Sequence, residues 1–123
     1  MSHGVDGRAA VPRIDAELGR SIAQTMQALS APSRVAILGR LREGACSVGE
    51  LTETVGMSQS AVSHQLAMLR HLGLVIGERH GRQVIYALHD PHVATLIEQA
   101  AFHAEHLRLG APMPIPVERE AAS

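Results

Sequence analysis

The stretch GMSQSAVSHQLAMLRHLGLVIGERHGR, from Gly56 to Arg82, decides the fold of this chain. Its third residue is Ser58, a residue type that favours the N-cap position of a helix. Apolar side chains then recur at the spacing of one buried helix face: Val62, Leu66 and Leu69. We therefore predict a helix from Ser58 to about Leu72, which ends before Gly73.

After Gly73 the hydrophobic period changes from that of a helix to that of strands. Residues 74–78 and 83–88 are short β-prone runs, and the pair His80-Gly81 between them suits a tight turn. The predicted hairpin carries two guanidinium groups at its tip, those of Arg79 and Arg82. A helix-turn-helix followed directly by a hairpin with a basic tip is typical of a winged helix.

On both sides of this stretch, the periodicity predicts four further helices, which span about residues 15–29, 30–44, 47–55 and 91–109. Ser30 is expected to cap the second, with Val35, Leu38 and Leu41 facing the core. Asp90 followed by proline is expected to cap the last. The predicted fold is mainly α: four helices, a two-stranded hairpin wing and a last helix, forming a homodimer through the first and last helices.

Composition supports one domain over residues 15–109, with flexible tails at 1–14 and 110–123, the second rich in proline. Of the 123 residues, 46% are apolar but only 2% are aromatic, which favours packed helices over a β-sandwich. Cys46 is the single cysteine, so no internal disulfide is possible. No window approaches the roughly 18 apolar residues of a membrane span, and no cationic start is followed by a long apolar run of the kind that marks a signal peptide. We expect a cytoplasmic protein that is not a membrane protein.

The predicted helix-turn-helix and wing are locally basic. Between Thr54 and His89 the charged side chains are Arg70, Glu78, Arg79 and Arg82. Eight residues are candidates for contacts with base edges or phosphates of double-stranded DNA: Ser58, Gln59, Ser60, Ser63, His64, Gln65, Arg79 and Arg82. The alternative is a set of solvated helix positions in an interaction module without DNA binding, but that module leaves the two wing arginines unexplained.

A second group of residues lies on the predicted last helix: Asp90, His92, His103 and His106. His92 and His103 are about 16 Å apart along such a helix, too far for one ion to bridge within a chain. Two copies packed antiparallel about a two-fold axis would bring Asp90 and His92 of one chain opposite His103 and His106 of the other. Capping by Asp90 and solvation of the histidines are the alternative interpretation, and capping alone explains Asp90.

Two residues near the N-terminus add further nitrogen donors. If the initiator methionine is removed, the amine of Ser2 and the amide and imidazole of His3 form a chelate; the alternative is an accidental histidine in a tail. The histidines of the predicted DNA-reading half are expected to be surface residues: His64, His71, His80 and His89. Cys46 is expected to be a small apolar filler.

The sequence also resembles a known family. Leu29 to Leu38, Ser58 to Leu66 and the wing resemble the ArsR/SmtB family of metal-sensing winged-helix repressors, over about residues 15–109. The resemblance implies that Asp90, His92, His103 and His106 are metal ligands between subunits. It also implies that the metal-free dimer binds operator DNA and that metal releases it.

Within that family the chain is most similar to the nickel/cobalt sensor branch of actinobacteria, in which the N-terminus is implicated in coordination. Ni²⁺ or Co²⁺ is therefore the expected effector. Arg108 stands where that branch has a further histidine, which leaves a Zn²⁺-responsive repressor as an alternative. An alternative of another class is a metal-dependent enzyme, but no further carboxylate or other base is placed to activate a metal-bound water.

Overall fold

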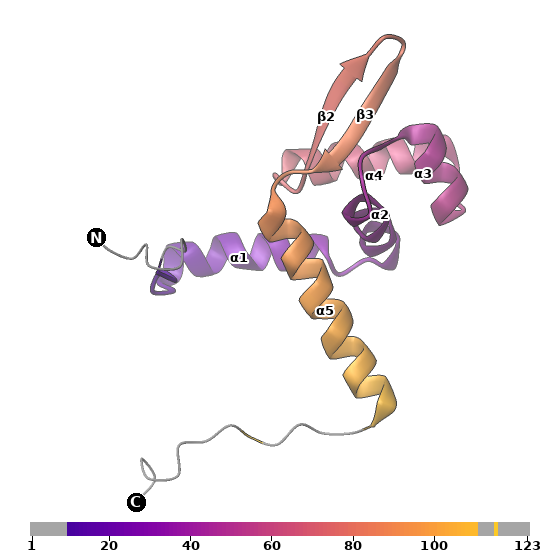
Figure 1. The fold of residues 1–123 in the computed structure, drawn as a ribbon. Coiled ribbons are helices and arrows are strands. Elements are labelled where there is room, and N and C mark those ends of the chain that lie inside the picture. The colour runs from indigo at the N-terminus through magenta and orange to yellow at the C-terminus, as the bar shows by residue number, and fades with distance from the viewer. Residues whose placement is uncertain (1–9, 111–114, 116–123) are drawn as a thin grey trace, which may run out of the picture.

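The computed structural model describes residues 10–110 and residue 115, and these form five helices and three strands. Figure 1 shows how the helices and the hairpin are arranged. The elements are α1 Ala16–Ala28, α2 Pro32–Arg42, β1 Cys46–Ser47, α3 Val48–Val55, α4 Gln59–His71, β2 Val75–His80, β3 Gln83–Leu88 and α5 Pro91–Leu109. The predicted winged helix-turn-helix, with its order of four helices, a hairpin and a last helix, is confirmed. Most of both predicted tails lies outside the described residues.

The core lies where α2, α3, α4 and the first half of α5 meet the strands. It consists of small and branched apolar side chains, the largest of them fully enclosed: Ile37, Leu38, Leu51, Val62, Leu66, Leu69 and Val75. The three predicted core residues of α4 are among them. Val35 was predicted to face the core but is 40% exposed. Ile37, Leu38 and Leu41 share one face at 3.6 residues per turn, and Val35 lies well to the side of it.

Helix starts follow the predicted capping residues, with one exception. Ser58 accepts a hydrogen bond from the Ala61 amide, and Asp90 accepts from the amides of His92 and Val93. Ser30 does not cap α2, whose N-cap is Ala31 without a side-chain hydrogen bond. The Ser30 hydroxyl donates instead to the Gln27 carbonyl at 2.6 Å, so this serine completes the end of α1.

The wing is part of a three-stranded antiparallel sheet with the order β1-β3-β2. The two-residue strand β1 was not predicted; Cys46 pairs with Tyr86, and Ser47 pairs with Ile85. The predicted turn is shifted by one residue, because His80 pairs with Gln83 and leaves Gly81-Arg82 as the turn. Gly81 has a φ of 66°, the positive value that a type II′ turn requires at its first central position.

Two helices extend away from this core, α1 and the second half of α5 (Figure 1). In α5, Val93 and Ile97 are buried within the chain, and Arg42 of α2 forms a 3.3 Å ion pair with Glu98. Further along, Phe102, Leu107 and Leu109 are each about two-thirds exposed. Val93 therefore belongs to the core of its own chain, and the unpartnered apolar side chains of α5 gather in its second half.

In the described part of the chain, no helix combines the length and the apolar character that crossing a lipid bilayer requires.

Candidate DNA interface and metal site

The first turns of α4 present small polar side chains to solvent. Ser58 caps the helix, and the exposed residues that follow are Gln59, Ser60, Ser63 and His64. Gln59 and Ser63 line a shallow hollow together with Arg82 of the wing and Ser47 at the start of α3. The fold thus brings candidate DNA-contacting residues from the helix and from the hairpin to one surface.

The hairpin register separates the charges of the wing by face. Side chains alternate between the two faces of a strand, and cross-strand partners share a face. Arg79 pairs with Val84 and so shares the face of Val84 and Tyr86, which line the hollow beside α4. Glu78 pairs with Ile85 on the opposite face, and there its carboxylate lies 2.9 Å from His80. The one acid of the wing therefore points away from α4, the candidate recognition helix.

Gln65 differs from the other candidate residues of α4. It is half-buried, and its Oε1 accepts a hydrogen bond from the Arg34 guanidinium at 3.3 Å. Arg34 also donates from Nε to the Ala28 carbonyl at 2.6 Å and from NH2 to the Gln27 carbonyl at 3.4 Å. One arginine of α2 therefore bridges the end of α1 and the middle of the recognition helix, a role that the sequence analysis did not foresee.

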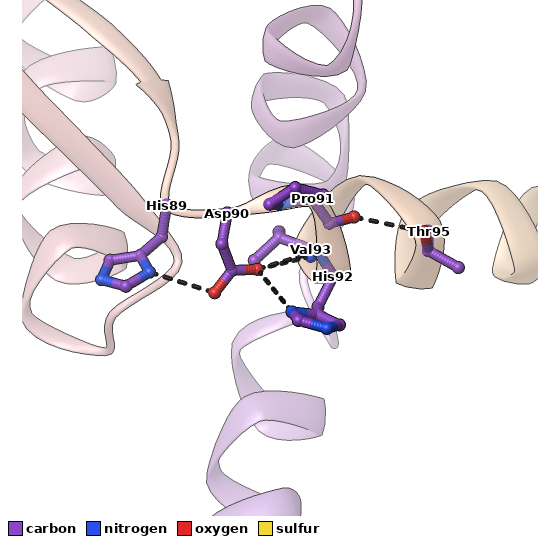
Figure 2. Close-up of polar contacts among 6 residues, drawn as sticks. All are labelled: His89, Asp90, Pro91, His92, Val93 and Thr95. Carbon is purple, nitrogen blue, oxygen red and sulfur yellow. Dashed lines mark hydrogen bonds and ion pairs between the residues drawn. The ribbon is translucent and has the colours of Figure 1, made fainter. Parts of the chain in front are cut away.

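Among the candidate metal ligands that the structure describes, Asp90 makes the most hydrogen bonds (Figure 2). Its Oδ1 accepts from the backbone amides of His92 at 2.9 Å and of Val93 at 3.2 Å. Its Oδ2 lies 3.2 Å from Nδ1 of His89. The hydrogen bond from His89 is the main reason that the pKa of the Asp90 carboxyl is lowered, with smaller contributions from the two amides. Asp90 is thus held as a carboxylate at the start of α5.

The three candidate histidine ligands lie in different surroundings on α5. The side chain of His92 is 95% exposed, and its Nδ1 lies 3.5 Å from Asp90 Oδ1. His103 is exposed, whereas His106 is half-buried, and its enclosed Nε2 has no hydrogen-bond partner among the described residues. An enclosed imidazole nitrogen without a partner is costly unless a donor or a metal ion meets it. Ser2 and His3 lie outside the described residues.

One chain does not bring the candidate ligands together. His92 is at the beginning of α5, and His103 and His106 are near its end, on a continuous helix of 19 residues. Within residues 10–110, no three His, Cys, Asp or Glu side chains are close enough to hold one metal ion. Any site that uses both ends of α5 requires a second copy of the helix.

The sequence analysis missed two functional candidates, Arg34 and His89. For His89 the sequence did contain a signal. It directly precedes Asp90, whose carboxylate was predicted to cap the last helix. Arg34 carried no local signal, since its partners are 31 and 6 residues away in sequence. Cys46 is buried at 2% exposure, and burial raises the pKa of its thiol, as fits an apolar filler.

Comparisons with known proteins agree with this geometry. Residues 31–76 match the family described as bacterial regulatory protein, arsR family. The transcriptional regulator NmtR of Mycobacterium tuberculosis is 52% identical over 112 residues, which cover 89% of this chain and 92% of NmtR. The repressor SmtB of the same species is 39% identical over 106 residues, covering 83% of this chain and 78% of SmtB.

Solved structures give the same result. The solution structure of apo-NmtR superimposes with a TM-score of 0.67 at 49% identity, covering 94% of this chain and 98% of that one. The homodimeric winged helix-turn-helix DNA-binding domain Mb0332 of Mycobacterium bovis superimposes with a TM-score of 0.73 at 26% identity, covering 81% of this chain and 93% of that domain.

The recognition helix, the turn before it and the wing with its basic tip define a winged-helix DNA-binding protein. This chain belongs to the arsR family of bacterial transcriptional regulators. It is a regulator of transcription and not an enzyme, so the metal-dependent enzyme considered from the sequence is not supported.

Proposed function

We propose that this regulator binds operator DNA as a homodimer and is released when a nickel or cobalt ion binds between the last helices of the two subunits. The observation that carries the proposal is the placement of nitrogen and oxygen donors at both ends of α5. Asp90 and His92 lie at its start, and His103 and His106 lie three residues apart near its end. An antiparallel second copy completes two equivalent sites.

The exposed surface of α5 supports such a pairing. Phe102, Leu107 and Leu109 are each about two-thirds exposed in the single chain, a large apolar area for one helix end. Covering these side chains with a second copy removes apolar area from water, which favours association. The Mb0332 domain, which shares this fold, is homodimeric.

The donor set fits a borderline metal ion. Asp90 would supply a carboxylate oxygen, and His92, His103 and His106 would supply imidazole nitrogens, with no sulfur ligand. The enclosed Nε2 of His106, which lacks a hydrogen-bond partner in the described structure, supports a role for this nitrogen in coordination. When bound, the ion would link residues of both subunits.

Linking the two subunits at α5 gives a physical route to DNA release. Recognition helices of a dimer must lie about one helical turn apart, ~34 Å, to enter successive major grooves. α5 packs on α2 through Ile97 and the Arg42–Glu98 ion pair, and Arg34 of α2 holds Gln65 of α4. A change in the spacing of the two α5 helices would therefore reach the recognition helices through packed side chains.

The choice between metals rests on the N-terminus. Four donors without sulfur suit tetrahedral zinc, whereas the Ser2 amine and His3 would complete the six-coordinate site that nickel and cobalt prefer. We expect deletion of Ser2 and His3 to weaken nickel binding far more than zinc binding, in competition titrations with a chromophoric chelator. Equal losses, or none, would make this a zinc-responsive regulator.

Mixed dimers test the site between subunits. A chain with Asp90→Ala and His92→Ala, paired with a chain with His103→Ala and His106→Ala, keeps one intact site and loses the other. Each mutant homodimer has only half-sites. We expect the mixed dimer, purified through two different tags, to bind one metal ion with nearly unchanged affinity while both homodimers bind poorly.

The same dimers report on the switch. In gel shifts on the chain's own promoter, nickel should weaken DNA binding, and operator DNA should weaken nickel binding by the same factor, since coupling is reciprocal. A mixed dimer that binds no more metal than the homodimers would overturn the intersubunit site. Metal binding that leaves DNA affinity unchanged would make the ion structural.

A further inference from the structure

A histidine that the DNA-binding and metal-ligand assignments leave unused, His89, directly contacts the candidate carboxylate ligand. Its Nδ1 lies 3.2 Å from Asp90 Oδ2, and its side chain is 49% exposed (Figure 2). A carboxylate only accepts hydrogen bonds, so His89 must be the donor in this contact. His89 is therefore present with a proton on Nδ1 and directs it at Asp90.

Counting lone pairs on Asp90 shows what this contact does. An ionised carboxylate has about four acceptor positions, two on each oxygen. Oδ1 uses its two positions for the amides of His92 and Val93, which start α5. Oδ2 uses one position for His89, and no residue of the described range 10–110 occupies the other. The free position of Oδ2 is the one that a metal ion can take without breaking the helix cap.

We propose that His89 is a positioning residue of the metal site, which fixes Asp90 through Nδ1–H so that Oδ2 faces the ion while Oδ1 caps α5. The inference rests on the proposed metal function and names a residue beyond its four ligands. Hydrogen-bond partners of a ligand orient it, and their loss commonly lowers metal affinity by about 10–100-fold.

Two substitutions at this position separate positioning from direct coordination. Asparagine places an amide N–H where histidine has Nδ1–H but offers no imidazole nitrogen to a metal. We expect His89→Ala to raise the nickel dissociation constant of the full-length dimer by about 10–100-fold. His89→Asn should stay close to the unchanged protein, with both values measured by chelator competition.

The wing supplies a matched control. His80 is also paired with a carboxylate, that of Glu78 at 2.9 Å, but through Nε2 and on the hairpin rather than beside the start of α5. His80→Ala should leave nickel affinity unchanged, so a loss specific to position 89 reports on Asp90. A second readout uses the metal-free protein: long-range ¹H–¹⁵N NMR above about pH 8, where a free imidazole is neutral, should show His89 protonated on Nδ1.

The outcomes are distinguishable. Equal losses for His89→Ala and His89→Asn would make His89 a ligand and overturn the positioning role, as would an unchanged affinity of His89→Ala or a proton on Nε2. His103→Ala tests the underlying function separately. If His103→Ala keeps full nickel affinity, the intersubunit site itself is wrong; if it loses affinity while His89→Ala does not, only the inference about His89 fails.

Discussion

The DNA-reading half of the molecule and its last helix differ in how far a single chain completes them. In the DNA-reading half, Val62, Leu66 and Leu69 of α4 are fully enclosed by their own chain, and the polar residues stay outside. In α5, only Val93 and Ile97 are buried, while Phe102 and Leu107 remain exposed. The first region is completed by a single chain, whereas the second leaves apolar side chains uncovered, as the proposed pairing of two α5 helices requires.

Under the proposed function, this difference corresponds to a division between DNA binding and the response to metal. A recognition surface works only if its side chains are held in place before DNA arrives, which requires a rigid core beneath it. A site that responds to an effector must instead have two arrangements of different free energy. The completed half is therefore expected to be insensitive to association, and α5 to depend on it.

The largest expected effect comes from the core of the DNA-reading half. Leu66→Ala removes a side chain with no exposed area and should lower the free energy of unfolding by about 2–5 kcal/mol, measured by urea denaturation.

Leu107→Ala, at a position 66% exposed, should keep the circular dichroism spectrum and raise the dissociation constant of the dimer. A dimer unaffected by Leu107→Ala would place the interface elsewhere.

A smaller effect is expected at the base of the wing. A Cβ at Gly77 would lie 2.9 Å from Cε1 of Tyr86 and 3.3 Å from Cγ1 of Val84. Gly77→Ala should therefore destabilise the protein by about 1–3 kcal/mol through overpacking. Gly39→Ala is the control, because a Cβ placed there meets no atom within 4 Å beyond its chain neighbours and the backbone of its own helix. Alanine also favours the helix by about 0.5–1 kcal/mol. Equal melting temperatures for the two variants would contradict the tight packing at Gly77.

Substitution of a wing arginine tests whether the wing contacts DNA. If Arg82 contacts phosphate in each subunit, Arg82→Ala removes two contacts per dimer and lowers the slope of log affinity against log salt by about 2. The loss should be similar for all DNA sequences, whereas Ser63→Ala should change the sequence preference. Arg20→Ala, on α1, is the matched loss of an exposed charge. A slope unchanged by Arg82→Ala would remove the wing from the interface.

The smallest expected effect is the dependence of stability on acid. Hydrogen bonds from the backbone and side chain of Ser47 lower the pKa of Glu50 below its ordinary 4.5, and His89 chiefly lowers that of Asp90 below 3.8. A lowered carboxyl pKa adds stability that is present above the ordinary value and is lost as the pH falls through the folded value. Urea denaturation of Glu50→Gln should show a weaker loss below about pH 4.5 than the unchanged protein.

The fold was predictable where the signal is local, and less so where distant residues meet. Ser58 and Asp90 predicted two helix starts because a cap is formed within three residues. The strand β1 escaped prediction because its two residues are defined by pairing with Tyr86 and Ile85, about 40 positions away in sequence. The separation of the candidate ligands along α5 was predictable from the rise of a helix, but the hydrogen bond of His89 depends on a rotamer that periodicity does not encode.

The two-residue turn at the tip of the wing determines which charge the hairpin presents beside α4, at the proposed DNA interface. Gly81 is the first central residue of the hairpin turn, and its positive φ fixes the register in which His80 pairs with Gln83. In a strand, a slip of one residue moves every side chain to the other face. A slip of β2 would turn Glu78 toward the recognition helix and Arg79 away from it, replacing attraction for phosphate by repulsion. The sign of the charge on the face beside α4 thus depends on the conformation of one uncharged residue, Gly81.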